Sequence, residues 1–363
     1  MKTLGELCNI VSGGTPLRSK TEFWDGGTIP WIKISNIKEK YVSEADEFIT
    51  EEGLLGSSAK MLNKGTVLYT IFATLGEVGI LKINACTNQA IAGLTIKDPT
   101  KLSTDYLYYY LKSKKSYVNS IGRGVAQNNI NMTLLKKFVI PLPNLLKQNE
   151  IVGVLDNVSN IIDIHQKELK YLDELVKARF VEMFGNPITN SKNLEAEKLK
   201  DVLILKAGDF TAASDISIER TPTNPYPCYG GNGIRGFVAE YNQDGDYSLI
   251  GRQGALSGNV QFARGRFKNT EHALLVKPKI EMDGMWLNQL LIHLDLKRYQ
   301  TGAAQPGLSV KNLQEIPIIL PPLEFQKQFA DFVREVDKSR EIIQKKIDTY
   351  QELFDKLMQE YFG

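Results

Sequence analysis

Two stretches of this chain resemble each other from end to end. Residues 143–185 are PNLLKQNEIVGVLDNVSNIIDIHQKELKYLDELVKARFVEMFG, and residues 321–363 are PPLEFQKQFADFVREVDKSREIIQKKIDTYQELFDKLMQEYFG. The likeness begins further upstream, so that residues 122–185 can be laid on residues 300–363 without a gap. A repeat of this kind indicates that one structural unit occurs twice in the chain.

Both stretches carry a heptad pattern of ten positions at alternating steps of four and three, eight of them apolar in the first copy and nine in the second, with no proline beyond the start. The pattern positions are Ile151, Leu155, Val158, Ile162, His165, Leu169, Leu172, Val176, Arg179 and Met183 in the first copy, and Phe329, Val333, Val336, Arg340, Ile343, Ile347, Tyr350, Phe354, Leu357 and Tyr361 in the second. The pattern predicts two long helices that pair as a coiled coil.

The repeat favours an antiparallel pairing, because a pseudo-twofold axis between the two copies would reverse their directions. The alternative is that each helix packs separately on its own domain. His165 and Arg340 are polar positions in the heptad pattern, and such residues more often set the register of a coiled coil than bind a metal ion.

The other residues form two stretches of mixed character. GTVLYTIF (65–72) and GDYSLIG (245–251) predict strands, whereas YLYYYLKS (106–113) and MWLNQLLIHL (285–294) predict short helices. We therefore predict an α+β protein with a globular domain at 1–142, a spacer helix at 143–185, a second globular domain at 186–320 and a second spacer helix at 321–363. The two globular parts differ in sequence, whereas the two helices are similar. The two globules are therefore expected to do the same kind of task on different targets.

Composition excludes several classes of protein. The 363 residues contain no apolar run long enough to span a membrane, and the start of the chain lacks the apolar core of a secretion signal. A cytoplasmic protein without membrane contact is expected. Cys8, Cys86 and Cys228 lie far apart, which argues against disulfides and a cysteine zinc site. The net charge is +2, yet residues 1–142 hold 17 basic against 12 acidic side chains, which permits a polyanionic partner.

No catalytic signature is present. GNGIRG at 231–236 matches the glycine pattern of a dinucleotide site, but it follows a proline-rich segment and precedes a strand-like one, so a turn is expected there. The chain has no N-P-P-aromatic or D-P-P-aromatic motif of an adenine methyltransferase, no phosphate-binding lysine loop and no metal-binding histidine spacing. We expect no catalytic residue, no cofactor and no metal ion on this chain.

Together these features resemble the specificity subunits of type I restriction–modification systems over the whole chain. GGTPLRSKTEFWDGGTIPWIKISNIKE (13–39) looks like part of a first target recognition domain, and residues 226–276 look like part of a second. The segments P-N-L-x-x-Q at 143–148 and P-P-L-x-x-Q at 321–326 resemble the family's proline–glutamine signature. The family often has an acidic residue before that glutamine, where this chain has Lys147 and Phe325.

The resemblance implies a non-catalytic subunit that reads a bipartite site in double-stranded DNA, one half with each recognition domain. The paired helices would set the spacing and recruit two modification subunits, which methylate adenine with S-adenosylmethionine; restriction subunits would be further partners. Two rival interpretations stay open at this point. One is a coiled-coil scaffold that displays two domains for ligands other than DNA, and the other is an enzyme that uses the glycine-rich loop.

Candidate DNA contacts are polar and basic residues in turn-rich segments, because such side chains hold phosphates and read base edges. In the first domain they are Arg18, Lys20, Lys33, Ser35, Asn36, Lys38, Gln127, Asn128 and Asn129. In the second they are Tyr229, Asn232, Arg235, Arg252, Gln253, Ser257, Asn259, Arg264, Lys268 and Gln305.

Overall fold

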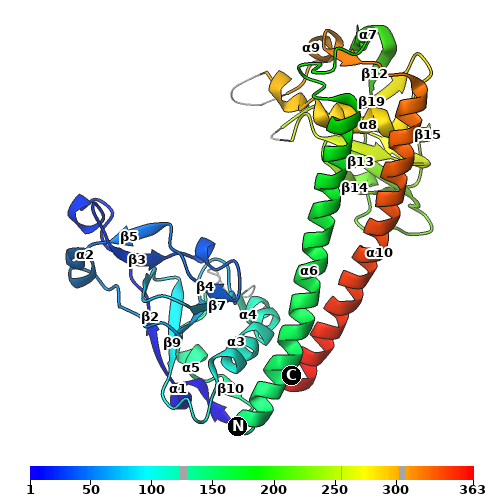
Figure 1. Cartoon of the computed structure of the whole chain (residues 1–363). Coiled ribbons are helices and arrows are strands. Elements are labelled where there is room, and N and C mark those ends of the chain that lie inside the picture. The colour runs from blue at the N-terminus through cyan, green and yellow to red at the C-terminus, as the bar shows by residue number, and fades with distance from the viewer. Residues whose placement is uncertain (123–128, 255, 302–306) are drawn as a thin grey trace. The chain divides into compact units, whose positions relative to one another are not determined.

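The computed structural model describes residues 1–122, 129–254, 256–301 and 307–363 (Figure 1). Its contacts divide the chain into two units, one made of residues 1–165 and 346–363 and the other of residues 166–345. Each unit combines strands with helices, and each contains part of the 40-residue helices α6 (Leu145–Phe184) and α10 (Leu323–Phe362). The predicted α+β class is confirmed.

The first unit contains a five-stranded sheet of order β2-β9-β6-β7-β4, a three-stranded sheet of order β5-β3-β8 and the pair β1-β10. Its strands are β1 (Lys2–Thr3), β2 (Cys8–Ser12), β3 (Ile29–Ile32), β4 (Tyr41–Val42), β5 (Glu47–Ile49), β6 (Val67–Thr70), β7 (Val78–Leu81), β8 (Cys86–Thr87), β9 (Ile91–Ile96) and β10 (Val139–Ile140). Its helices are α1 (Leu4–Leu7), η1 (Thr21–Phe23), η2 (Ile34–Asn36), α2 (Glu51–Leu55), α3 (Thr104–Ser113), α4 (Lys115–Gly122) and α5 (Met132–Lys136).

Helix α3 packs against β6 and β7 and buries six consecutive residues, from Tyr106 to Leu111. The hydroxyl of a buried tyrosine usually finds a hydrogen-bond partner. Tyr106 and Tyr110 donate hydrogen bonds of 3.1 Å to the carbonyl oxygens of Pro141 and Val139. These bonds tie α3 to the chain that leads into α6.

The second unit has two four-stranded sheets, of orders β12-β19-β16-β17 and β14-β13-β18-β15, and the pair β11-β20. Its strands are β11 (Ala196–Lys198), β12 (Leu203–Ala207), β13 (Tyr226–Gly230), β14 (Gly233–Val238), β15 (Gln243–Asp244), β16 (Tyr247–Gly251), β17 (Val260–Ala263), β18 (Arg266–Asn269), β19 (Ala273–Pro278) and β20 (Pro317–Ile319). Its helices are α7 (Leu199–Val202), η3 (Ala213–Asp215), α8 (Gly284–His293), η4 (Leu296–Tyr299) and α9 (Val310–Gln314).

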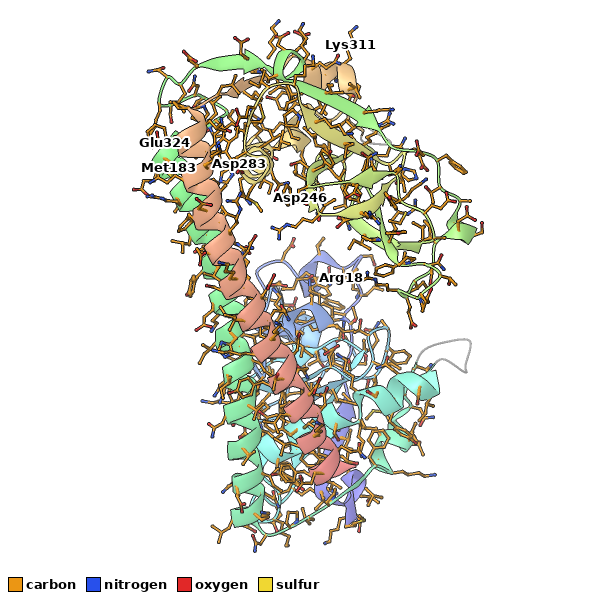
Figure 2. The ribbon with its side chains drawn as sticks, turned by 90° about the vertical axis from the view of Figure 1, so that its right-hand side faces the viewer. Arg18, Met183, Asp246, Asp283, Lys311 and Glu324 are labelled. Carbon is orange, nitrogen blue, oxygen red and sulfur yellow. The ribbon has the colours of Figure 1, made fainter. Side chains whose placement is uncertain are left out.

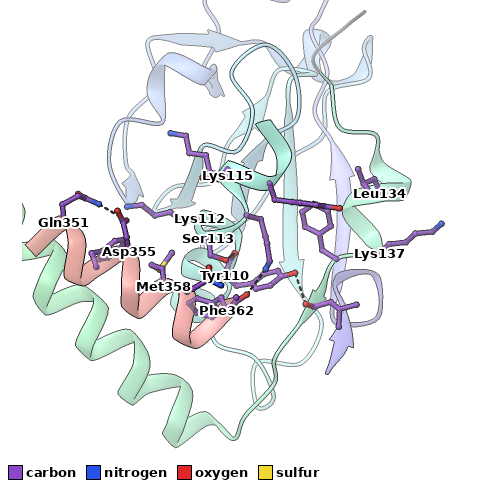
Figure 3. Close-up of a pocket in the computed structure, with 18 residues that line it drawn as sticks. Tyr110, Lys112, Ser113, Lys115, Leu134, Lys137, Gln351, Asp355, Met358 and Phe362 are labelled. Carbon is purple, nitrogen blue, oxygen red and sulfur yellow. Dashed lines mark hydrogen bonds between the residues drawn. The ribbon is translucent and has the colours of Figure 1, made fainter. Parts of the chain in front are cut away.

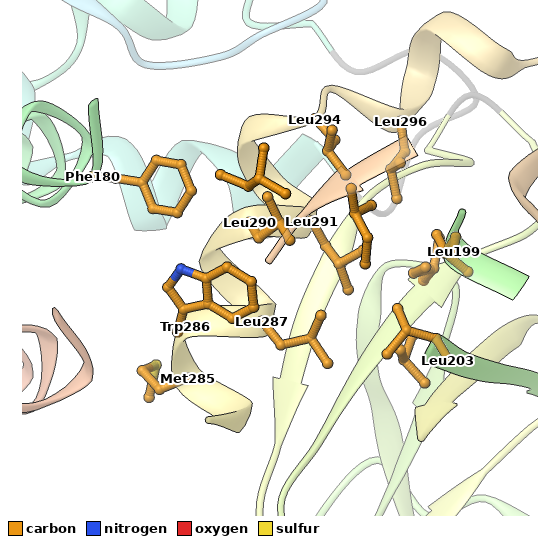
Figure 4. Close-up of a cluster of buried hydrophobic side chains, with 14 of the residues drawn as sticks. Phe180, Leu199, Leu203, Met285, Trp286, Leu287, Leu290, Leu291, Leu294 and Leu296 are labelled. Carbon is orange, nitrogen blue, oxygen red and sulfur yellow. The ribbon is translucent and has the colours of Figure 1, made fainter. Parts of the chain in front are cut away.

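The core of the second unit gathers around α8 (Figure 4). Trp286, Leu290 and Leu291 are fully buried and belong to the same apolar cluster as Phe180 of α6. This cluster also takes in Phe329 of α10, so the sheet, α8 and both long helices share one core.

The two units repeat one arrangement of elements. In each, a short first helix leads into a strand that pairs with the last long strand, as β2 pairs with β9 and β12 with β19. A glycine follows each of these first strands. A Cβ at Gly13 would lie 2.2 Å from the Asn88 carbonyl oxygen, and one at Gly208 would lie 2.1 Å from that of Asn269. Such close approach admits no side chain, so the same turn is built twice.

The long helices pair in antiparallel fashion, as predicted. In the first unit His165 of α6 lies 6.1 Å, ring to ring, from Tyr350 of α10. In the second unit Asp173 of α6 forms a 2.7 Å ion pair with Arg340 of α10. From residue 165 to residue 173 of α6 the partner in α10 changes from residue 350 to residue 340, so the two helices run antiparallel. The predicted heptad positions are all buried or half-buried.

A buried glutamine fixes the start of each long helix to its globule. The Gln148 amide donates 2.8 Å hydrogen bonds to the carbonyl oxygens of Lys101 and Pro143, and its oxygen accepts from the Ser103 amide at 2.9 Å. Gln326 repeats this arrangement, donating to Pro321 at 2.8 Å and accepting from the Asp283 amide at 3.0 Å. The proline–glutamine signature therefore acts as an internal clamp.

Replacing this glutamine should destabilise the first unit. Gln148→Ala removes three hydrogen bonds and leaves buried backbone groups unpaired, so we expect the free energy of unfolding to fall by about 1–3 kcal/mol. The control is Lys147→Ala, because Lys147 is exposed and forms a surface ion pair with Glu150. Urea unfolding followed by circular dichroism measures both, and equal midpoints for the two variants would refute the clamp.

Charges at the contact between helix and globule are inverted from one unit to the other. Asp156 of α6 forms a 2.6 Å ion pair with Lys40 of the globule. The equivalent position in the repeat is Arg334 of α10, which pairs at 3.1 Å with Asp283, labelled in Figure 2. At this contact each globule therefore carries a charge opposite to that of its own helix. It would meet a like charge if it packed on the other long helix.

His293 should make the second unit sensitive to acid. It stacks on Phe180 with ring centroids 4.2 Å apart, and burial lowers its pKa. The unfolded chain gains a proton near pH 6.5, whereas the folded unit gains it only at a lower pH. Stability is therefore expected to fall as the pH drops from about 7 to 5, by about 1.4 kcal/mol per unit of difference between the two pKa values.

The test compares the urea midpoint of the wild type with that of His293→Phe across this pH range. Phenylalanine keeps the stack on Phe180 but does not titrate, so its midpoint should depend less steeply on pH. Parallel curves for the two proteins would show that His293 does not carry the effect.

Candidate nucleic-acid interface

Two of the predicted DNA contacts in the first unit meet at one carboxylate. Arg18, labelled in Figure 2, lies between β2 and η1, and Lys33 directly follows β3. Arg18 Nη2 lies 2.5 Å from Glu47 Oε2, and Lys33 Nζ lies 2.5 Å from Glu47 Oε1. Hydrogen bonding from Lys33 is the main cause of the lowered pKa of Glu47, with a further contribution from Arg18. The group of three side chains keeps a single net positive charge.

Two tryptophans lie beneath Arg18. Its guanidinium carbon is 3.6 Å from the ring centroid of Trp24 and 4.9 Å from that of Trp31. The two rings meet edge to face, with centroids 5.1 Å apart. Trp31 is buried and its indole N–H donates to the Gly14 carbonyl at 3.0 Å, so this platform is fixed by the globule.

The other predicted residues of the first unit lie in several settings. Lys20, Ser35 and Lys38 are exposed; Lys20 directly precedes η1, Ser35 lies in η2 and Lys38 lies two residues after η2. Asn36 accepts a 2.8 Å hydrogen bond from the Lys33 backbone, so its side chain shapes the turn. Asn129 forms an isolated bridge with Phe72. Gln127 and Asn128 lie outside the described residues.

In the second unit the glycine-rich loop is a hairpin turn. Residues 231–232 join β13 to the antiparallel β14, which contains the rest of the motif and begins at Gly233 with φ 99°. The end of β16 closes on this turn, because a Cβ at Gly251 would lie 2.3 Å from the Gly231 carbonyl oxygen. The motif thus runs from strand to strand and lacks the strand–helix context of a dinucleotide site.

This turn brings several predicted contacts together. The Asn259 amide donates to Asn232 at 3.2 Å. Gln253 Oε1 lies 3.1 Å from His272 Nδ1, and Arg252 Nη1 donates to the Glu271 carbonyl at 3.3 Å. Polar side chains from the loops that follow β13, β16 and β18 are therefore paired, Asn259 with Asn232 and Gln253 with His272.

The remaining predicted residues of the second unit are more scattered. Arg235 is exposed, Arg264 pairs with Asp337 at 3.4 Å, and Lys268 lies 3.7 Å from Asp209. The Tyr229 ring packs on Phe267, and Ser257 is fully buried, so its hydroxyl does not face solvent. Gln305 lies outside the described residues.

A separate basic hollow of about 1090 Å³ occurs in the first unit between α3, α4 and the end of α10 (Figure 3). Three of the lysines that line this hollow make contacts within the protein. Lys114 donates to the Phe362 carbonyl at 2.8 Å, Lys115 pairs with Glu77 at 2.7 Å, and Lys112 lies over the Phe354 ring. Within the described ranges no helix could cross a membrane and no cluster of three potential metal ligands occurs.

Comparison with known proteins decides the family. The sequence matches the type I restriction modification DNA specificity domain twice, over residues 1–174 and 191–350. This chain belongs to the specificity subunits of type I restriction–modification systems. It is 32% identical to the EcoprrI specificity subunit of Escherichia coli, over 92% of this chain and 86% of the relative.

Further relatives agree. The MjaIX specificity subunit of Methanocaldococcus jannaschii is 23% identical over 99% of this chain and 91% of its own length. A crystal structure of the specificity subunit from M. genitalium shares the fold, with a TM-score of 0.59 and 18% identity over 100% of this chain and 95% of that one. Specificity subunits are non-catalytic, and the chain is therefore not itself an enzyme.

Sequence reasoning missed the residues that hold the predicted contacts in place. Glu47, Trp24 and Trp31 around Arg18, and His272 beside Gln253, were not among the candidates. The segment WDGGTIPW at 24–31 offered one signal, because two tryptophans in a turn-rich basic stretch suggest a platform for a cation. No signal in the sequence indicated Glu47, because only the pairing of β3 with β5 brings it near Arg18.

Proposed function

We propose that each unit of this specificity subunit reads one half of a bipartite site in double-stranded DNA. What supports this is the family together with the doubled fold: the same arrangement occurs twice, with different polar side chains at the two candidate surfaces. Similar folds with different surfaces suit two half-sites of different sequence. The antiparallel helices α6 and α10 would set the number of base pairs between the half-sites.

The chemistry would be supplied by other subunits. Two modification subunits would bind this chain and methylate an adenine in each half-site with S-adenosylmethionine, and restriction subunits would join them for cleavage. This chain would bind no cofactor or metal ion itself. Its task is then to place two catalytic subunits over chosen adenines, in the cytoplasm where the DNA lies.

The proposed contacts are the polar and basic side chains named from the sequence, with the exposed ones best placed to act. In the first unit the exposed ones are Arg18, Lys20, Ser35 and Lys38, with Lys33 half-buried, and in the second they are Asn232, Arg235, Gln253 and Arg264, with Asn259 and Lys268 half-buried. Lysines would hold phosphates, whereas arginine, asparagine and glutamine would read base edges.

Selection from random duplexes tests this function. The chain, assembled with a modification subunit encoded beside it, is incubated with a duplex library, and bound DNA is sequenced. Two short conserved blocks with a fixed unread gap would support the proposal. Bound DNA without any enriched sequence, or no bound DNA, would favour a scaffold that displays its domains to other ligands.

A further inference from the structure

We propose that Arg18 reads a guanine in the half-site bound by the first unit, and that Glu47 and Trp24 are its positioning residues. This inference rests on the proposed function, and it names the base and the residues that make the choice. Three observations support it: the stacking of Arg18 on Trp24, the ion pair with Glu47, and the remaining N–H donors of the guanidinium.

One face of the guanidinium is fixed. Trp24 supports it at 3.6 Å from ring centroid to guanidinium carbon, and the Trp24 indole N–H donates to the Leu17 carbonyl at 3.3 Å. Trp31 supports Trp24 from the side and is itself buried. A stacked arginine loses little further freedom on binding, so its plane is set before DNA arrives.

The ion pair holds Arg18 through one nitrogen of its guanidinium, Nη2. Nη2 lies 2.5 Å from Glu47 Oε2 and is therefore committed to this carboxylate. The Arg18 side chain keeps 53% of its surface exposed. One of the five N–H groups of Arg18 faces Glu47, and within the described part of the chain Arg18 donates no other hydrogen bond, so two neighbouring N–H groups remain for a ligand.

Glu47 also disfavours the commonest alternative ligand of Arg18, a phosphate of the DNA backbone. A phosphate at Arg18 would be attracted less strongly than by an unpaired arginine, because the ionised Glu47 lies beside it. The edge of guanine carries no net charge and offers the acceptors O6 and N7 at the spacing of the arginine fork. Arg18 and Glu47 together therefore favour guanine over nonspecific phosphate binding.

The test uses the assembled complex and duplexes that carry its selected site, with all four bases placed in turn at each half-site position. Dissociation constants are measured at several salt concentrations for the wild type, Arg18→Lys, Glu47→Gln and Trp24→Leu. Lys20→Ala serves as the charge control, because it removes a neighbouring cation that cannot form a fork. Circular dichroism melting shows whether each variant is folded.

Arg18→Lys should lose roughly 10- to 100-fold in preference for guanine at one position and leave the other half-site unchanged. Glu47→Gln should bind unrelated duplexes more tightly, with a salt slope steeper by about one, and should discriminate guanine less. Trp24→Leu should also lose guanine preference. Lys20→Ala should weaken binding to every sequence alike.

The proposal is overturned if Arg18→Lys behaves like Lys20→Ala, which would mark Arg18 as a phosphate contact. It is also overturned if the relaxed position prefers a base other than guanine. A wild-type complex with no sequence preference would be a different result, because it would remove the proposed function and not merely the role of Arg18.

Discussion

Adding one heptad to each long helix is expected to lengthen the gap between the two half-sites by about three base pairs. Seven helical residues add about 10.5 Å, and one base pair of duplex occupies about 3.4 Å. Duplicating residues 166–172 in α6 and 341–347 in α10 keeps both heptad patterns in phase, so the apolar positions still meet. The base sequences of both half-sites should stay as in the wild type.

Sequencing of duplexes selected by the lengthened complex measures the gap directly. The control is a heptad added to α6 alone, which puts the two helices out of register and should reduce stability without giving a new defined gap. An unchanged gap in the doubly lengthened protein would contradict the assignment of the helices as the spacer.

Phe329→Ala is expected to destabilise the second unit by about 3–5 kcal/mol, the range for loss of a fully buried phenylalanine. Phe329 has no exposed surface and contacts Phe180 and Phe184 of α6 at ring distances of 5.4 and 5.6 Å. Its removal would open a cavity where both helices and the globule meet. Phe325, one turn earlier and 50% exposed, provides the control.

Hydrogen exchange read by mass spectrometry resolves this effect by unit. Peptides from α8 should exchange faster in Phe329→Ala, whereas those from α3 should change little and Phe325→Ala should match the wild type. Equal acceleration in α3 and α8 would show that the chain unfolds as one cooperative body. No acceleration at all would refute the shared core.

Much of the fold could be predicted because it depends on local pattern. The heptads predicted two paired helices, and the structure has them at Leu145–Phe184 and Leu323–Phe362. GDYSLIG and MWLNQLLIHL became β16 and α8. In each case the period of apolar residues is set by the element's own geometry, so no distant contact was needed to recognise it.

The candidate site was less accessible to sequence reasoning, because long-range pairing creates it. Arg18 meets Glu47 only when β3 pairs with β5, and Ser257 is buried in a loop whose carbonyl accepts a 2.6 Å hydrogen bond from the distant Gln300. The glutamines at 148 and 326 were recognised as a family signature, but their hydrogen bonds to the globules depend on the packed structure. Chemical type alone could not separate contact residues from supporting ones.

The most direct test of the central claim is a map of methylated adenines across a genome that expresses this chain with its modification subunit, read by single-molecule sequencing. We predict methylation at one split motif, with two short half-sites separated by a gap of fixed length. Methylation at an uninterrupted motif, or at no defined motif in cells that contain the intact complex, would contradict the account.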